Sequence, residues 1–412
     1  MMAALPLPAE VGRQPTGFGE PPPMTAEGSI AHTPSYLLAA FFEQMNAAQI
    51  PYCLLNGFQG YPDVVASDVD FMVHPSNAER IAPLLLEVAA RCGALLVQAI
   101  RHEIGAWYFV LAKQEGCAVT YLHPDCSTNY RRDGRLWLEA DQVLQNRQPY
   151  KTFFVPAIAD EFLYYLTKKV LKQRITGAQW QRIAALYLSR AEECSERIRR
   201  FWSEETAEAL VLALERQDIG WMESYLPALL SELRASVPAE SWWQRVKQRA
   251  REWRRRLERA VNPTGLSIAV CGGTEQQRDQ LAVALEQNLR PAFRRTMICA
   301  EDTGSEVVLG AARLWLAKVR STLVIRKKES VGTEWLVRDD IDFVLSDSKV
   351  GEAIDGRHGG NVRNLRVALD GGRALERSLE LAIRIALEHL AARLQRRMKL
   401  REPSRLTARG VE

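Results

Sequence analysis

Two aspartates inside one apolar segment constrain the fold of this chain more than any other feature. Asp68 and Asp70 stand at positions i and i+2 of the run Ser67–Val73, and apolar residues alternate with them. Because strand side chains alternate between two faces, both carboxylates lie on one face and the apolar side chains on the other. Buried carboxylates need a partner, and a hard cation such as Mg²⁺ fits this need. The alternative is a strand that begins with two solvent-exposed aspartates.

The segments around this strand predict a small α/β unit. Apolar periodicity predicts a helix over 35–48, a strand over 50–55, the Asp-x-Asp strand, a helix over 75–93, and strands over 94–100, 106–112 and 117–123. Gly57 lies in the turn before the Asp-x-Asp strand, and the last strand ends at Asp125. A third carboxylate that arrives beside two others is what a two-metal phosphoryl-transfer site requires.

This order of elements resembles the nucleotidyltransferase superfamily, which has a polymerase β-like fold. The resemblance implies that Asp68 and Asp70 hold Mg²⁺ and that Asp125 completes the metal site or acts as a base. It also implies that Gly57 lets the backbone approach a phosphate, with Ser67 in the same binding set and a nucleoside triphosphate as a possible ligand. The family usually has a serine after the turn glycine, where this chain has Phe58.

A lysine pair follows on the next predicted helix, over 161–172. Lys168 and Lys172 are one helical turn apart and share a face of that helix. They are candidates for binding an anionic ligand or cofactor. The alternative is a lysine face that is only solvated.

The C-terminal region combines buried strands with helices. A strand over 266–270 precedes a glycine loop and a helix that ends near 289, and further strands are predicted over 296–300, 322–325, 342–346 and 365–370, with helices over 307–319 and 374–394. Alternating strands and helices predict a parallel sheet with helices on both faces.

The glycine loop stands where a phosphate-binding loop would be, but its chemistry is different. A working loop reads G-x-x-x-x-G-K-[ST]. Gly272 matches the first glycine and Arg278 takes the place of the lysine, so both are candidates for binding an anion. Gln277 lacks the conformational freedom of glycine, and the nearby acidic side chains repel phosphate. We therefore predict a degenerate loop that does not use Mg-ATP.

The whole order resembles bacterial proteins in which a nucleotidyltransferase-like half precedes a thymidylate kinase-like domain, and which are associated with exopolysaccharide and other surface-glycan clusters. The resemblance implies metal-dependent nucleotidyl or phosphoryl-group transfer onto a nucleotide or a phosphorylated small molecule, with polysaccharide-assembly proteins as partners. The kinase signatures are reduced to Arg338-Asp339 and to the loop 355–360, so kinase activity is not expected. The alternative is a non-catalytic scaffold or regulator of a polysaccharide assembly system.

Composition agrees with several domains. The expected parts are a disordered, proline-rich segment over 1–30, a nucleotidyltransferase-like domain over 31–150, a helical connector over 151–261, the degenerate kinase-like domain over 262–395, and a basic tail over 396–412. The seven cysteines show no disulfide or zinc spacing, which predicts reduced thiols and a cytoplasmic protein. No apolar run reaches the roughly 18 residues of a membrane span.

The connector ends in a basic helix over 242–259. Eight Lys and Arg against two Glu give it a net charge of +6, while the whole chain has +4. Three interpretations are open. In the one that we favour, the apolar stripe of the helix (Trp243, Val246, Trp253 and Leu257) is buried between domains and the arginines point outward. The second is contact with an anionic membrane surface, peripheral to the inner membrane. The third and least favoured is binding of nucleic acid.

Overall fold

A computed structural model of the chain describes residues 34–299, 315–328, 342–346, 363–366 and 372–399. The predicted disordered segment, most of the helix over 307–319, the kinase signature positions and the tail beyond 399 lie outside the described residues.

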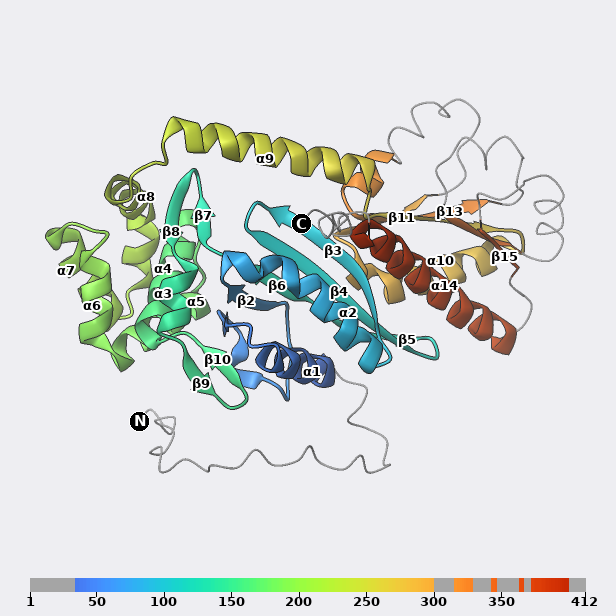
Figure 1. The fold of residues 1–412 in the computed structure, drawn as a ribbon, viewed down its shortest axis with the longest axis horizontal. Coiled ribbons are helices and arrows are strands. Elements are labelled where there is room, and N and C mark those ends of the chain that lie inside the picture. Colours follow the sequence, from blue (N-terminus) through green and yellow to red (C-terminus); the bar gives the residue numbers. More distant parts are fainter. Residues whose placement is uncertain (1–33, 300–314, 329–341, 347–362, 367–371, 400–412) are drawn as a thin grey trace, which may run out of the picture. The chain divides into compact units, whose positions relative to one another are not determined.

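The first sheet is built around the Asp-x-Asp strand. Its strands are β1 (Tyr52–Leu54), β2 (Val69–Val73), β3 (Leu95–Glu103), β4 (Ala106–Glu115), β5 (Ala118–Leu122) and β6 (Pro124–Ser127), and the helices of this part are α1 (Pro34–Ala47), the 3-10 helices η2 (Phe58–Gly60) and η3 (Pro75–Arg80), and α2 (Ile81–Arg91). The strand order is β1-β2-β6-β4-β3, with β5 also pairing with β4. Strands β2 and β6 are parallel, and the other neighbours are antiparallel. Thus the helices and strands predicted for this part are present (Figure 1).

One strand differs from the prediction. The predicted strand over 117–123 ends at Leu122, and Asp125 lies inside the separate strand β6 instead of at a strand end. The chain breaks its pairing at His123: β5 pairs with the far half of β4, and β6 then enters between β4 and β2. This insertion makes Asp125 a direct neighbour of the Asp-x-Asp strand.

Alternation along β2 sorts the side chains between the two faces of this sheet. Val69 and Phe71 pack with α1 and α2 in one core, while Met72 packs with the connector helices on the opposite face. Asp70 stands between Val69 and Phe71 and therefore lies on the connector side. The face that holds the acids is thus the one not covered by α1 and α2.

The connector predicted over 151–261 is helical, but two hairpins that the sequence pattern did not indicate precede its helices, and the first of them lies before residue 151. The elements from residue 130 to residue 261 are β7 (Tyr130–Arg132), β8 (Arg135–Leu138), α3 (Ala140–Gln145), β9 (Gln148–Tyr150), β10 (Phe153–Val155), α4 (Ile158–Lys172), α5 (Gly177–Ser189), α6 (Ala191–Arg199), α7 (Glu204–Glu215), α8 (Ile219–Ser236) and α9 (Trp242–Val261). Helices α4 to α8 share one core with the connector face of the first sheet. This core holds α4 beside β2.

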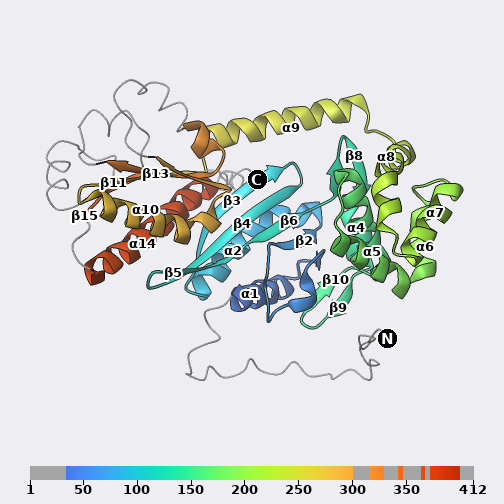
Figure 2. The same ribbon diagram turned by 180° about the vertical axis from the view of Figure 1, so that it is seen from behind.

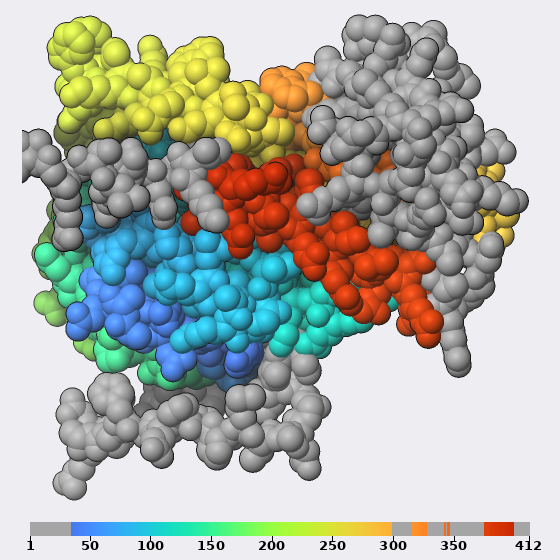
Figure 3. Space-filling view, turned by 45° about the vertical axis from the view of Figure 1, so that its right-hand side comes forward, coloured from blue at the N-terminus to red at the C-terminus, as the bar shows by residue number. Residues whose placement is uncertain are grey.

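The C-terminal part contains the predicted parallel sheet. Its elements are β11 (Leu266–Cys271), α10 (Glu275–Leu289), the 3-10 helix η4 (Arg290–Ala292), β12 (Arg295–Cys299), β13 (Thr322–Lys328), β14 (Phe343–Ser346), β15 (Arg363–Arg366) and α14 (Gly372–Lys399). The strand order is β12-β13-β11-β14-β15, with every pairing parallel. Helix α14 packs against this sheet and also against β3, so Val97 and Val110 of the first sheet share a core with it. In Figure 3 the red surface of α14 lies directly against the cyan surface of the first sheet.

The prediction for the basic helix is wrong. Helix α9 contains no buried residue, and Trp243 and Trp253 are 62% and 65% exposed. The reason is that its polar side faces the protein: Arg255 donates to the backbone carbonyl of Arg101, and Arg259 donates to that of Val319. Figure 2 shows α9 as one unbroken helix between α8 and β11. In the part of the chain that the structure describes, no helix has the length and apolar character needed to cross a membrane.

Candidate functional site: an acidic cluster on the first sheet

Three aspartates meet on the connector face of the first sheet. Asp70 and Asp125 are paired in register on the parallel strands β2 and β6. Their side chains are about a quarter exposed, while Asp68, just before β2, is half exposed. The structure therefore brings together the three acids that the sequence singled out, with Asp68 on the solvent side.

Three stacked aromatic rings lie beside Asp68, and two of them contact its carboxylate. The hydroxyl of Tyr108 donates to Asp68 Oδ1 over 3.3 Å, and His123 Nδ1 lies 3.7 Å from the same oxygen. The His123 ring is stacked between those of Tyr108 and Tyr121. His123 Nε2 lies 3.1 Å from the carbonyl oxygen of Pro291, so the C-terminal part contacts this stack of rings. Tyr108 reaches the site because it lies on β4 directly opposite Asp125 of β6. This residue was not among the predicted site residues, because no spacing in the sequence indicates that pairing.

Lys168 is the cation next to the acids. Its Nζ lies 3.7 Å from Asp70 Oδ2 and donates to the hydroxyl of Tyr164 over 2.9 Å. Burial alone would lower the pKa of Lys168, but Tyr164 and Asp70 outweigh it and hold the pKa above its usual value. Lys168 is thus charged at neutral pH and turned inward. Lys172, one turn later, is exposed, and burial together with Lys168 lowers its pKa. The lysine pair is therefore split: Lys168 faces the acids and Lys172 stands at their edge.

The surroundings of Asp125 favour its neutral, protonated form. Burial and the nearby carboxylates of Asp70 and Asp68 raise the pKa of Asp125 to about 7. Lys168 acts in the opposite direction but does not cancel this effect. A carboxyl with a pKa near neutrality exchanges a proton readily, which suits a general base.

Neither histidine of the site adds positive charge to the cluster at neutral pH. His102 Nε2 lies 3.9 Å from Asp125 Oδ1, but burial and the neighbouring arginines Arg294 and Arg255 lower the pKa of His102 to about 4. Burial also lowers the pKa of His123. Both rings are therefore neutral at pH 7. The contacts of His102 with Asp125 and of His123 with Asp68 are thus not ion pairs at that pH.

Gly57 and Ser67 lie together at one side of the cluster. Gly57 has a φ of +73°, a left-handed conformation that favours glycine. A Cβ at this position would lie 3.8 Å from the Tyr61 hydroxyl and 3.9 Å from Ser67 Oγ. Burial, and then Asp70 and Asp68, raise the pKa of Tyr61 to about 12. Tyr61 Oη is buried and has no hydrogen-bond partner among the described residues.

The acids supply suitable donors for Mg²⁺ but no preformed cage. Among the described residues, no three His, Cys, Asp or Glu side chains are arranged to hold a metal ion. However, Mg²⁺ commonly takes only one or two protein carboxylates and completes its shell with water and substrate phosphate. Burial raises the pKa of Asp125 most, and the carboxylates of Asp70 and Asp68 raise it further; a bound cation would oppose both effects. Asp68, Asp70 and Asp125 therefore fit Mg²⁺ that arrives with a phosphate-bearing ligand.

The glycine loop is a separate place, away from the acids. Gly272 has a φ of +80°, and buried Arg278 donates to the carbonyl of Gly273 over 2.8 Å and to that of Gly272 over 3.3 Å. The side chains of Thr274 and Gln277 cap the start of α10 reciprocally. Helix α10 spans 15 residues, about 22 Å, and its other end contacts Tyr121 through the carbonyl of Asn288.

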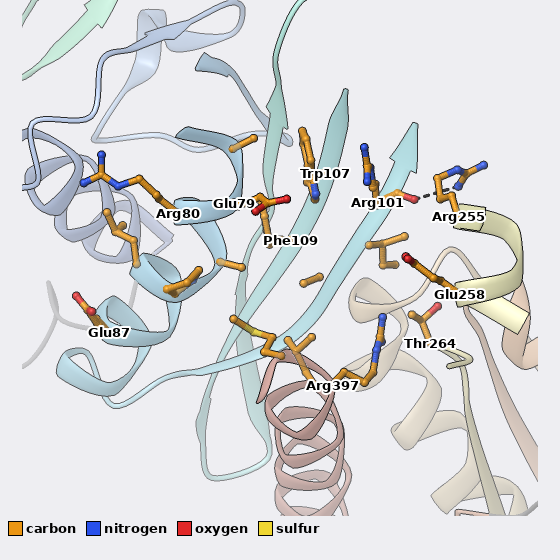
Figure 4. Close-up of a pocket in the computed structure, with 18 of the residues that line it drawn as sticks. Glu79, Arg80, Glu87, Arg101, Trp107, Phe109, Arg255, Glu258, Thr264 and Arg397 are labelled. Carbon is orange, nitrogen blue, oxygen red and sulfur yellow. Dashed lines mark hydrogen bonds between the residues drawn. The ribbon is translucent and has the colours of Figure 1, made fainter. Parts of the chain in front are cut away.

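A cleft of about 1320 Å³ lies on the opposite face of the first sheet. Trp107 and Phe109 of β4 line it (Figure 4). Tyr108, between them in the sequence, instead contacts Asp68. Its arginines are largely engaged: Arg80 donates to the carbonyl of Ala48, and Arg255 to that of Arg101. None of the sequence-predicted site residues lines this cleft.

No protein-family profile matches this chain, and a search of curated proteins finds no significant match to it.

Proposed function

We propose that the acidic cluster performs Mg²⁺-dependent nucleotidyl or related phosphoryl-group transfer. The observation that supports this most is the in-register pairing of Asp70 with Asp125 on parallel strands, with Lys168 beside them. The proposed substrates are a nucleoside triphosphate and a nucleotide or phosphorylated small-molecule acceptor. Participation in bacterial surface-polysaccharide assembly, in the cytoplasm, depends on the resemblance described above.

Each residue has a distinct role in this proposal. Asp68 and Asp70 would hold Mg²⁺, which when bound neutralises phosphate charge. Asp125, with its pKa near 7, accepts a proton from the attacking hydroxyl or takes part in holding the cation. Lys168 binds a phosphate oxygen. The hydroxyl of exposed Ser67, beside Gly57, offers the phosphate contact that Phe58 cannot make, because Phe58 has no polar side-chain atom and is buried against Tyr150.

The test uses Mn²⁺ as a spectroscopic substitute for Mg²⁺ on the full chain. Electron paramagnetic resonance should detect Mn²⁺ binding that rises in affinity when a nucleoside triphosphate is present, and that is lost in Asp70→Asn. The matched control is Asp63→Asn, which removes the same charge at a side chain 79% exposed and paired with Lys151. Equal Mn²⁺ binding by both variants would refute the metal site.

A second candidate is a non-catalytic scaffold in a polysaccharide assembly system. The observation that favours it is the glycine loop, whose carbonyls are already bound by Arg278 and whose helix start is capped by the chain itself. In this alternative both parts bind ligands without turnover. Pyrophosphate release from a triphosphate panel distinguishes the two candidates: Mn²⁺ binding without any Mg²⁺-dependent release, whatever acceptor is supplied, supports the scaffold.

A further inference from the structure

Helix α9 packs on the protein with its polar side and leaves its apolar side outward. A surface helix normally buries its apolar stripe. Here the contacts that hold the helix on the protein come from Gln248, which donates to Glu240, from Arg255, which donates to the Arg101 carbonyl, and from Arg259, which donates to the Val319 carbonyl. These residues occupy one side of the helix, and the apolar stripe occupies the other.

The outward stripe is long and consists of large side chains. Its exposed members are Trp242, Trp243, Val246, Trp253, Leu257 and Val261. Trp242 and Trp243 stack on each other with ring centroids 4.0 Å apart. At about 1.5 Å per residue the stripe extends over roughly 28 Å. In the view of Figure 3, no described segment lies over the upper side of the yellow α9.

Basic side chains border this stripe on both edges. At about 100° per residue, Arg245, Arg249 and Arg256 follow one edge of the apolar arc, and Lys247, Arg251 and Arg254 follow the other. All six are exposed. The two acidic residues of α9 do not lie within the arc. Glu252 is on the inner side, where it is bonded to Arg255 and to the border residue Arg256, and Glu258 is half-buried, with Arg254 as a partner.

We propose that α9 is a membrane-surface helix that inserts its tryptophan stripe into an anionic lipid bilayer. The arc of Trp, Leu and Val matches the acyl boundary, and its arginine and lysine borders match the anionic headgroups on both sides. The helix is already supported on its polar side, so insertion requires no rearrangement of the protein core. This inference does not depend on the acidic cluster or its chemistry.

Other occupants fit this surface less well. A second copy of α9 would bring two sets of like-charged borders together, which is repulsive. Nucleic acid would find stacking partners in Trp243 and Trp253, but Val246, Leu257 and Val261 of the same stripe offer it neither a phosphate contact nor an aromatic ring, and they would stay exposed to water. An anionic bilayer is the partner that satisfies both the stripe and its borders.

The experiment is flotation of the full chain with vesicles of phosphatidylcholine containing about 30 mol% phosphatidylglycerol, compared with pure phosphatidylcholine, at about 50 and about 500 mM NaCl. The triple variant Arg249→Gln, Arg254→Gln, Arg256→Gln should weaken partitioning on the order of a hundredfold at low salt. The matched control is the triple variant Arg190→Gln, Arg199→Gln, Arg200→Gln, which removes the same charge from exposed positions of the connector. The double variant Trp243→Ser, Trp253→Ser tests the apolar stripe without changing charge.

We expect binding to anionic vesicles that falls with salt, falls with the first triple variant and the tryptophan variant, and is unaffected by the control variant. Equal binding to neutral vesicles, or equal loss in both triple variants, would overturn the proposal. So would a dimer in light scattering that dissociates in the tryptophan variant, or salt-sensitive binding of a single-stranded oligonucleotide through Arg249, Arg254 and Arg256 with no vesicle binding. An unchanged thermal midpoint in the tryptophan variant verifies that lost flotation is not lost folding.

Discussion

Asp70 and Asp125 face each other in register across two parallel strands, although 54 intervening residues separate them in the chain. Strand β6 achieves this by entering between β2 and β4 directly after the chain leaves β5. The pairing concentrates negative charge on a partly buried surface. Lys168 lies beside Asp70 there, and the rings of Tyr108 and His123 lie beside Asp68. The following predictions concern this acidic cluster, the glycine loop around Arg278 and the exposed stripe of α9.

The Asp125 carboxyl should make stability depend on pH in a defined direction. Its pKa is about 7 in the folded protein and 3.8 as the ordinary value, so the folded state holds a proton that the unfolded state has lost. The contribution of this protonated carboxyl to the free energy of unfolding is fully present below about pH 4 and is lost as pH rises through 7. Asp125→Asn should therefore be close to neutral at about pH 4 and should stabilise the protein by roughly 2–4 kcal/mol at pH 8.

Urea denaturation of wild type and Asp125→Asn across this range measures the difference directly. Asp141→Asn serves as the control, because Asp141 is 62% exposed and its neighbour is His74. A constant difference between wild type and Asp125→Asn from pH 4 to pH 8 would contradict the raised pKa.

Lys168→Gln should weaken binding of phosphate-bearing ligands and should also raise the pKa of Asp125 further. Lys168 lies beside Asp70 and lowers the pKa of Asp125, so removing its charge leaves the acids less compensated. Calorimetry with Mg²⁺ and pyrophosphate should show affinity reduced by about tenfold or more. Carbon-13 NMR of the carboxyl groups reports the titration independently of any ligand.

Lys169→Gln is the matched control, since Lys169 lies over the Tyr165 ring on the same helix. If both lysine variants shifted the Asp125 titration equally, the specific contact of Lys168 with the cluster would be disproved.

The glycine loop should not bind ATP. Arg278 already donates to the carbonyls of Gly272 and Gly273, and Lys327 pairs with Asp279. In an Asp70→Asn background, which removes the acidic cluster as a nucleotide site, millimolar ATP with Mg²⁺ should leave the thermal midpoint unchanged. A rise of several degrees that disappears on adding Arg278→Ala would show that the loop does bind nucleotide.

Arg278→Ala should itself lower the free energy of unfolding by about 1–3 kcal/mol, because it removes the Arg278 donor from the buried carbonyl of Gly272 and from the part-buried carbonyl of Gly273. Arg290→Ala, at an exposed position after α10, should change it little. Similar losses in both variants, measured by urea denaturation, would mean that Arg278 does not close the loop.

Exposure of the α9 stripe should make its tryptophans dispensable for folding. Trp253→Ala should change the free energy of unfolding by no more than about 0.5 kcal/mol. Trp180→Ala, which removes a side chain 1% exposed in the connector core, should cost about 3–5 kcal/mol. Chemical denaturation compares the two. A loss of several kcal/mol for Trp253→Ala would show that the stripe is covered in solution.

Local patterns were sufficient to predict much of the first sheet and of the parallel sheet. The two-residue period around Asp70 put the acids on the face opposite Phe71, and α1 and α2 do cover the Phe71 face. Such predictions succeed because alternation and helical periodicity are properties of neighbouring residues. The insertion of β6 was not predictable in this way, since pairing depends on which distant strand edge is open.

The sequence by itself determined the chemistry of this protein: the three aspartates, the altered glycine loop around Arg278, and a helix with both a tryptophan stripe and a charge of +6. Only the tertiary structure decided how these groups are used. Lys168 became the partner of Asp70 because the connector core holds α4 beside β2. The apolar stripe of helix α9 faces outward because Arg255 and Arg259, on its opposite side, donate to the carbonyls of Arg101 and Val319. A periodic pattern specifies that a helix has an apolar side, but long-range contacts decide which side is buried.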